Sequence, residues 1–271
     1  MDARLQRRVQ RYGWDKAASS YERYWREQLA PAQQRLLELA APCPGERVLD
    51  VACGTGLVTF PAATSVGAEG RIVATDISDA MVTQVGDEAR RRGLTQVHTI
   101  RMDAEALEFA EGSFDATLCA LGLMYVPDPA VAFTQMRRVL RAGGRAVAAV
   151  WGARRNCGWA EIFPIVDRRV ASEVCPMFFQ LGTGDTLAET MRSAGFTSIE
   201  ASRLTTTLHY TSPDEACGAA FAGGPVALAY SRFDEAVRAE AHAEYLTSIE
   251  PWRSGRSYAV PGEFVVARGI A

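Results

Sequence analysis

The most constraining feature of this chain is an apolar run that ends at an acid and then turns through two glycines. Residues 47–59 read Arg-Val-Leu-Asp-Val-Ala-Cys-Gly-Thr-Gly-Leu-Val-Thr, with the acid at Asp50 and the glycines at Gly54 and Gly56. Glycine takes backbone angles that are closed to residues with a Cβ, and it lets a ligand approach the main chain closely. The pattern predicts a β-strand, a ligand-binding turn and a helix.

Such a turn suits either a dinucleotide or a sulfonium cofactor, and two residues separate these alternatives. The dinucleotide pattern has a third glycine where this chain has Thr59. Asp50, at the end of the predicted strand, would repel a pyrophosphate but would attract the ammonium group of a methionine moiety. The residues therefore favour S-adenosyl-L-methionine, whose product is S-adenosyl-L-homocysteine, over a nicotinamide dinucleotide.

Two further predicted strands also end near acids. Residues 71–76 form an apolar run that ends at Asp76, which can accept hydrogen bonds from both ribose hydroxyls of a nucleoside. Residues 97–101 lead to Asp103 and Ala104, which together can receive an adenine amino group. Because ligands bind at the carboxyl ends of the strands in open α/β sheets, we expect these acids to line one crevice with Asp50.

These motifs, in this order, resemble those of the class I S-adenosylmethionine-dependent methyltransferases. The resemblance is strongest to the group that contains the ubiquinone and menaquinone biosynthesis C-methyltransferases, and it covers about residues 45–151. One departure is Ala52, where many members have a glycine. The matching segments are residues 48–56, 74–78, 102–105, 113–116 and 139–145.

The resemblance implies a cofactor site. Asp50 and the Gly54–Gly56 turn would face the methionine part of the cofactor, Asp76 the ribose, and Asp103 with Ala104 the adenine. Ala120 and Leu121 would approach the methyl group that is transferred. The expected cofactor-binding residues are Tyr21, Asp50, Ala52, Gly54, Gly56, Asp76, Ile77, Met81, Asp103, Ala104, Ala120 and Leu121.

Strands and helices alternate as far as Trp151, which predicts parallel βαβ units with right-handed crossovers. The resemblance implies an α/β fold of the Rossmann-like type: a seven-stranded, mostly parallel sheet in the order 3-2-1-4-5-7-6, with strand seven antiparallel and helices on both faces. We expect a single methyltransferase domain over residues 1–271. Its parts would be N-terminal cap helices (1–44), a cofactor-binding core (45–151), and the rest of the sheet (152–271) with lid insertions at about 153–185 and 212–255.

Several element boundaries follow from capping and breaking residues. Asp128 and Pro129 can begin a helix, and Gly143-Gly144 is expected to end it and open a strand. Further elements are expected as helices at 15–40, 185–194 and 233–246, and as strands at 145–151, 196–210 and 262–268.

Methyl transfer from a sulfonium is an in-line displacement, so alignment and exclusion of water can provide much of the acceleration. A general base is needed only when the acceptor must lose a proton. The candidate catalytic residues are Tyr125, which either faces the acceptor or packs in the core, and His209, which lies at a strand end where a lid insertion begins. His98 is expected to be structural, and His242 to lie on a solvated helix face. Tyr21 is expected either to contact the cofactor or to pack an amphipathic helix.

Composition narrows the function further. The net charge of −3 among 271 residues lacks the basic bias of a dedicated nucleic-acid binder. The N-terminus has no apolar signal segment and no run of 18 apolar residues follows, so we expect no membrane span and a cytoplasmic location. The six cysteines form no Cys-x-x-Cys pair, which favours reduced thiols, and we expect no metal site.

The leading hypothesis is methyl transfer to a small-molecule acceptor, either aromatic or otherwise apolar. One alternative is an NAD-dependent oxidoreductase, which Thr59 and Asp50 disfavour. Another is a catalytically silent S-adenosylmethionine-binding protein, which the sequence barely constrains. The sequence assigns neither the acceptor, nor the atom that would be methylated, nor the oligomeric state.

Overall fold

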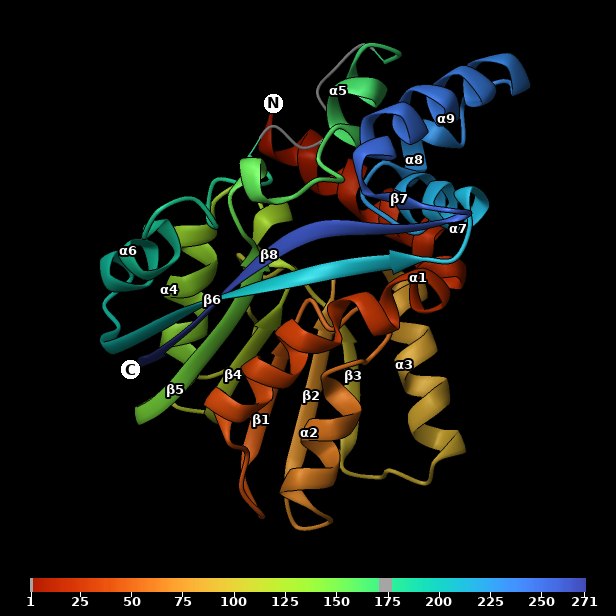
Figure 1. The fold of residues 1–271 in the computed structure, drawn as a ribbon. Coiled ribbons are helices and arrows are strands. Elements are labelled where there is room, and N and C mark those ends of the chain that lie inside the picture. Colours follow the sequence, from red (N-terminus) through yellow and green to blue (C-terminus); the bar gives the residue numbers. More distant parts are fainter. Residues whose placement is uncertain (1, 171–176) are drawn as a thin grey trace.

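The computed structural model describes residues 2–170 and 177–271, and a single mixed sheet runs through it (Figure 1). Its strands lie in the order β3-β2-β1-β4-β5-β8-β6, and the short β7 pairs with β8 outside this path. The strands are β1 (Arg47–Val51), β2 (Arg71–Asp76), β3 (Val97–Arg101), β4 (Phe114–Ala120), β5 (Leu140–Trp151), β6 (Thr197–Tyr210), β7 (Arg253–Ser254) and β8 (Ser257–Ile270).

The helices cover both faces of the sheet and the end at which the parallel strands have their carboxyl termini. In Figure 1, α1, α2 and α3 lie on one face and α4 and α6 on the other, while α5, α7, α8 and α9 gather beyond the carboxyl ends of the parallel strands. The helices are α1 (Ala3–Ala40), α2 (Thr59–Val66), α3 (Asp79–Arg91), α4 (Pro129–Val139), α5 (Ile162–Asp167), α6 (Thr186–Ser193), α7 (Pro213–Cys217), α8 (Ala227–Tyr230) and α9 (Glu235–Ile249).

The topology confirms the expected Rossmann-like fold. Strands β1 to β5 are parallel in the order 3-2-1-4-5, and β8 runs antiparallel between β5 and β6. The final strand β8 therefore takes the place expected for strand seven, and β7 adds a short strand that the sequence analysis did not include. Because β1, β2, β3 and β4 are parallel, their carboxyl ends lie at one edge, where ligands bind in such sheets.

Several element boundaries differ from those expected, and the largest shifts concern the start of α1, the junction of α4 with β5, and β8, which begins at Ser257 rather than at residue 262. Helix α1 begins at Ala3 rather than at residue 15, because the side chain of Asp2 caps it by accepting hydrogen bonds from the backbone N–H groups of Arg4 and Leu5. Helix α4 ends at Val139, and the glycine pair lies inside β5 instead of separating helix from strand. The register between β4 and β5 shifts beside this pair, so the glycines form an irregularity within the strand.

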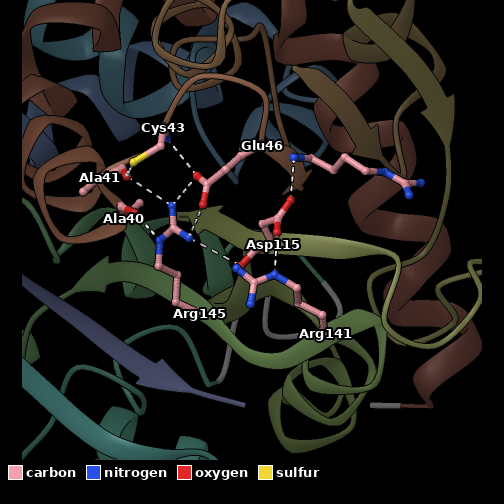
Figure 2. Close-up of polar contacts among 8 residues, drawn as sticks. Ala40, Ala41, Cys43, Glu46, Asp115, Arg141 and Arg145 are labelled. Carbon is pink, nitrogen blue, oxygen red and sulfur yellow. Dashed lines mark hydrogen bonds and ion pairs between the residues drawn. The ribbon is translucent and has the colours of Figure 1, made fainter. Parts of the chain in front are cut away.

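At the amino ends of the strands, a polar network joins the end of α1 to the sheet (Figure 2). The guanidinium of Arg145 on β5 donates to the carbonyl oxygens of Ala40 and Ala41, and its ion pair with Glu46 measures 2.6 Å. These carbonyls end α1 and have no partner within the helix. Arg145 therefore caps α1 and fixes its direction across the sheet.

Two further expectations concerned reduced cysteine thiols and membrane-spanning helices. Five cysteines within the described residues are free thiols, and Cys175 lies outside those residues. Over residues 2–170 and 177–271, we find no helix with the length and apolar character needed to cross a bilayer.

Candidate active site

A cavity of about 710 Å³, part of it open to solvent, lies at the carboxyl ends of β1, β2, β3 and β4. It is covered by the N-terminal half of α1. Ten of the twelve expected cofactor residues line it, namely Tyr21, Ala52, Gly54, Asp76, Ile77, Met81, Asp103, Ala104, Ala120 and Leu121. Tyr125, a candidate catalytic residue, lines it too.

The turn after β1 has the backbone geometry that the glycine pattern predicts. Gly54 and Gly56 have φ angles of 54° and 90°, in the left-handed region that glycine enters without strain. Ala52 also lies there, with a φ of 56°, which explains why a glycine suits this position in similar proteins. A methyl group added to Gly54 would lie 4.0 Å from the ring of Tyr21, so this ring lies directly over the turn.

Asp76, the last residue of β2, holds this turn in place. One of its carboxylate oxygens accepts the backbone N–H of Gly54 and the other accepts that of Ser78, both at 2.9 Å. Only 7% of Asp76 is exposed, and burial raises the pKa of its carboxyl group, although these backbone donors act in the opposite direction. Each carboxylate oxygen retains a lone pair for a further donor.

Asp50 lies elsewhere than expected. It is 1% exposed, does not line the cavity, and accepts a hydrogen bond of 2.6 Å from the hydroxyl of Thr59 at the start of α2. Burial raises the pKa of the Asp50 carboxyl to about 7, against the opposing effect of this hydrogen bond. Asp50 therefore supports the turn from below. Gly56 also lies outside the cavity, and a Cβ added to it would collide with the ring of Phe60.

An N-terminal cap over residues 1–44 was expected, but the sequence did not predict the contacts that hold the N-terminal half of α1 over the cavity. Arg7 on α1 forms ion pairs of 2.7 Å with both Asp103 and Glu105, across nearly a hundred residues of chain. Asp15 on the same helix accepts a hydrogen bond of 2.6 Å from the hydroxyl of Ser78. The lining residues missed from the sequence are Arg7, Gln10, Trp14, Met102, Gly122, Val126 and Pro127.

A second cavity adjoins the first and is lined mainly by aromatic and aliphatic side chains. It encloses about 440 Å³, part of it open to solvent. Trp14, Tyr21, Leu121 and Tyr125 line both cavities, so the two meet at these four residues. Tyr125 lies at this boundary with its ring centroid 5.0 Å from that of Trp14 and 5.4 Å from that of Phe178.

The structure does not bring the histidines to either cavity. His209 is exposed on β6 and makes its two hydrogen bonds with Gln28 through backbone atoms. His98 is exposed on β3. The expectation for His242 was wrong: it is half-buried, packs on Phe221 and lies 3.0 Å from the hydroxyl of Tyr230, because α9 turns this face toward residues 218–222 and α8.

Comparison with known proteins confirms the resemblance inferred from the motifs. A family model described as a methyltransferase domain matches residues 48–144. Aklanonic acid methyltransferase DauC of Streptomyces sp. (strain C5) is 36% identical over 49% of this chain and 60% of its own length. The ubiquinone/menaquinone biosynthesis C-methyltransferase UbiE of Teredinibacter turnerae is 35% identical over 58% of this chain and 64% of its own length. The matched regions thus span less than two thirds of either relative.

The fold has solved counterparts. A putative methyltransferase from Bacillus halodurans superimposes with a TM-score of 0.63 at 20% identity, over 89% of this chain and 98% of that structure. At this identity the likeness extends to the fold, while the chemistry of the site depends on its residues.

Proposed function

From a chain whose residues 48–144 match the methyltransferase domain family, we propose an enzyme that binds S-adenosyl-L-methionine and transfers its methyl group to a small-molecule acceptor. One observation carries the proposal: ten residues expected from the motifs to bind the cofactor line a single cavity, and this cavity shares four lining residues with a second, apolar one. The first cavity is the proposed cofactor site and the second the acceptor site.

The residues of the first cavity fit this cofactor. Asp76 keeps acceptor capacity for ribose hydroxyls, and Asp103 offers a carboxylate where the adenine is expected. Apolar side chains, including Ile77 and Met81, provide walls for a flat base. The turn at Ala52 and Gly54 leaves main-chain groups accessible for the methionine part.

When bound, the sulfonium supplies a methyl group whose C–S bond breaks as a bond to the acceptor atom forms, leaving a neutral thioether. The chain's own contribution is to align the two reactants and to exclude water. The ring of Tyr21 lies where the two cavities meet. A tyrosine hydroxyl is already protonated near pH 7, and burial raises the pKa of this one further, so it is a neutral hydrogen-bond donor there. We therefore assign Tyr21 to positioning rather than to proton removal.

We further propose that the insertions at about 153–185 and 212–255 form a lid over the acceptor, a proposal that leaves out residues 171–176, which lie outside the described residues. Support comes from Trp159 and Phe178 of the first insertion and from residues 223–225 of the second, all of which line the second cavity. A cytoplasmic location is also part of the proposal, supported by the free thiols of the described cysteines.

The test is transfer of a tritiated methyl group from S-adenosylmethionine to an organic-solvent extract of small molecules, with Asp76→Asn as the site variant. The substitution removes a carboxylate from the ribose position, so we expect cofactor affinity to fall by roughly tenfold or more. The matched control is Asp87→Asn, since Asp87 is an exposed acid on α3.

The proposal is supported if the unmodified protein forms labelled product. At subsaturating cofactor, Asp76→Asn should form less of this product, and Asp87→Asn should form as much as the unmodified protein. Binding of S-adenosylhomocysteine with no transfer to any component of the extract would favour the silent cofactor-binding protein instead. Unchanged cofactor affinity in a folded Asp76→Asn protein would refute the ribose assignment.

A further inference from the structure

We propose that the second cavity binds a flat, uncharged aromatic acceptor that carries a carbonyl oxygen, and that the indole N–H groups of Trp25 and Trp159 recognise this oxygen. The inference rests on the proposed function, because it takes the second cavity as the acceptor site.

Trp25 on α1 and Trp159 in the first insertion both line this cavity and are 6% and 3% exposed. The Nε1 atoms of both are buried, and neither donates to an acceptor on any residue that the structure describes. Buried polar groups in folded proteins nearly always have a partner, and leaving one unpaired is unfavourable. An indole N–H only donates, so the missing partner is a hydrogen-bond acceptor such as a carbonyl oxygen.

The other lining residues define the rest of the ligand. Trp25 lies 6.1 Å from Trp151 and 6.2 Å from Trp159 between ring centroids, and Phe178 lies 5.6 Å from Trp159. Aromatic rings at these separations offer faces and edges against which another flat ring packs favourably. Among the described lining residues there is no Asp, Glu, His, Lys or Arg, and a charged acceptor would lose its hydration there without compensation.

The cavity also orients such an acceptor. The two indoles belong to the second cavity alone, whereas Tyr21, Leu121 and Tyr125 also line the cofactor cavity. The atom that receives the methyl group must reach this shared boundary. The recognised carbonyl and the methylated atom therefore occupy different ends of one molecule, and the indoles select the acceptor without taking part in the transfer.

The experiment compares ketones with hydrocarbons of the same frame, measured by calorimetry on the full chain saturated with S-adenosylhomocysteine. The three pairs are 1-tetralone with tetralin, 9-fluorenone with fluorene, and benzanthrone with its parent hydrocarbon. We expect at least one ketone to bind about tenfold more tightly than its hydrocarbon, as a hydrogen bond to an otherwise unpaired donor predicts.

Trp25→Phe and Trp159→Phe remove the N–H groups but keep an aromatic ring, and at least one of them should reduce this preference several-fold. Trp252→Phe is the control, because Trp252 is half-buried outside the cavity. A preserved affinity for S-adenosylhomocysteine shows that a variant is folded. If either variant does not fold, the ketone preference of the unmodified protein still tests the acceptor assignment.

Failure of the inference is distinct from failure of the proposed function. Normal binding of S-adenosylhomocysteine, with no ketone bound more tightly than its hydrocarbon, overturns the acceptor assignment alone. A ketone preference that both Trp25→Phe and Trp159→Phe retain in full overturns the role of the indoles. Absence of S-adenosylhomocysteine binding overturns the methyltransferase assignment itself.

Discussion

Asp50 shows at the scale of one residue how a strand-end acid can support the turn beside a cavity without lining that cavity. Its partner in β2 is Ala74, two residues before Asp76, so Asp50 lies inside the sheet whereas Asp76 lies at its edge. The buried carboxyl with a pKa of about 7 and the hydroxyl of Thr59 form a single hydrogen-bonded pair beneath the turn. We infer that Asp50 stabilises the turn and acts on the cofactor only through it.

This arrangement predicts how Asp50→Asn changes stability with pH. The pKa of Asp50 is raised on folding, so the folded state binds the proton more tightly, and stability falls as pH rises from the ordinary value of 3.8 to about 7. Asparagine cannot ionise but can still accept from Thr59. As pH rises from 4.5 to 8, the unfolding free energy of Asp50→Asn should increase by roughly 2–3 kcal/mol relative to that of the unmodified protein. Urea unfolding at the two pH values measures this change. A stability difference that is constant with pH would contradict this account.

The sequence could predict which residues lie beside the cavity where backbone position alone determines this. Asp76, Gly54 and Ala120 lie at strand ends or in the turn, and strand order brings such positions together. Asp50 needed the register between β1 and β2 as well, and Arg7 needed a contact across the chain that no local pattern encodes. The unpaired indole of Trp159 became visible only once burial and hydrogen bonding were known.

At the scale of elements, α1 has two functions along its length. Its C-terminal half packs on the sheet, and its N-terminal half lies over the proposed cofactor cavity, tied there by Arg7 to Asp103 and Glu105. The sequence predicted the packed half from its apolar stripe. The expected N-terminal cap (1–44) included the covering half, but the sequence predicted neither its helix before residue 15 nor its ion pairs, because the partners that hold it belong to the loop after β3.

Helix α1 should therefore slow the release of the cofactor product. Arg7→Gln removes the ion pairs, and we expect S-adenosylhomocysteine to dissociate about 3–10 times faster, in line with partly exposed charge pairs. In the unmodified protein, high salt should produce part of the same increase by screening.

Stopped-flow dissociation at low and high salt measures both effects. Arg35→Gln is the matched control, since Arg35 lies on α1 and pairs with Glu38 at its surface. Equal dissociation rates for Arg7→Gln and the unmodified protein would show that these ion pairs do not hold the cover closed.

Across the whole molecule, the two ends of the sheet serve different purposes. The carboxyl ends of the strands carry the cavities and the left-handed residues Ala52 and Leu121, whereas the amino ends carry the network of Arg145, Glu46 and Asp115 (Figure 2). Backbone strain is commonly concentrated at functional sites and requires support from the surrounding structure. We infer that the network at the amino ends contributes to stability and not to ligand binding.

Glu46→Gln tests this division. Burial alone would raise the pKa of Glu46, but its hydrogen bonds to Arg145 and to the backbone N–H of Cys43 lower it. The stability from ionised Glu46 is therefore present above its ordinary pKa of 4.5 and is lost as pH falls through the lower folded value. At pH 7 we expect Glu46→Gln to cost about 1 kcal/mol of unfolding free energy, because solvent screens the pair in part.

Affinity for S-adenosylhomocysteine should stay the same in Glu46→Gln, and Glu38→Gln, an exposed change on α1, should alter neither property. Denaturant unfolding and ligand titration measure the two properties separately. A loss of affinity comparable to that of Asp76→Asn would show that the two ends of the sheet are coupled.

The most direct test of the central claim is calorimetric titration of the full chain with S-adenosylhomocysteine, with NADH as the parallel ligand. The account predicts saturable binding of one S-adenosylhomocysteine per chain and no binding of NADH. Binding of NADH alone would contradict it and would return the Gly54–Gly56 turn to the dinucleotide hypothesis.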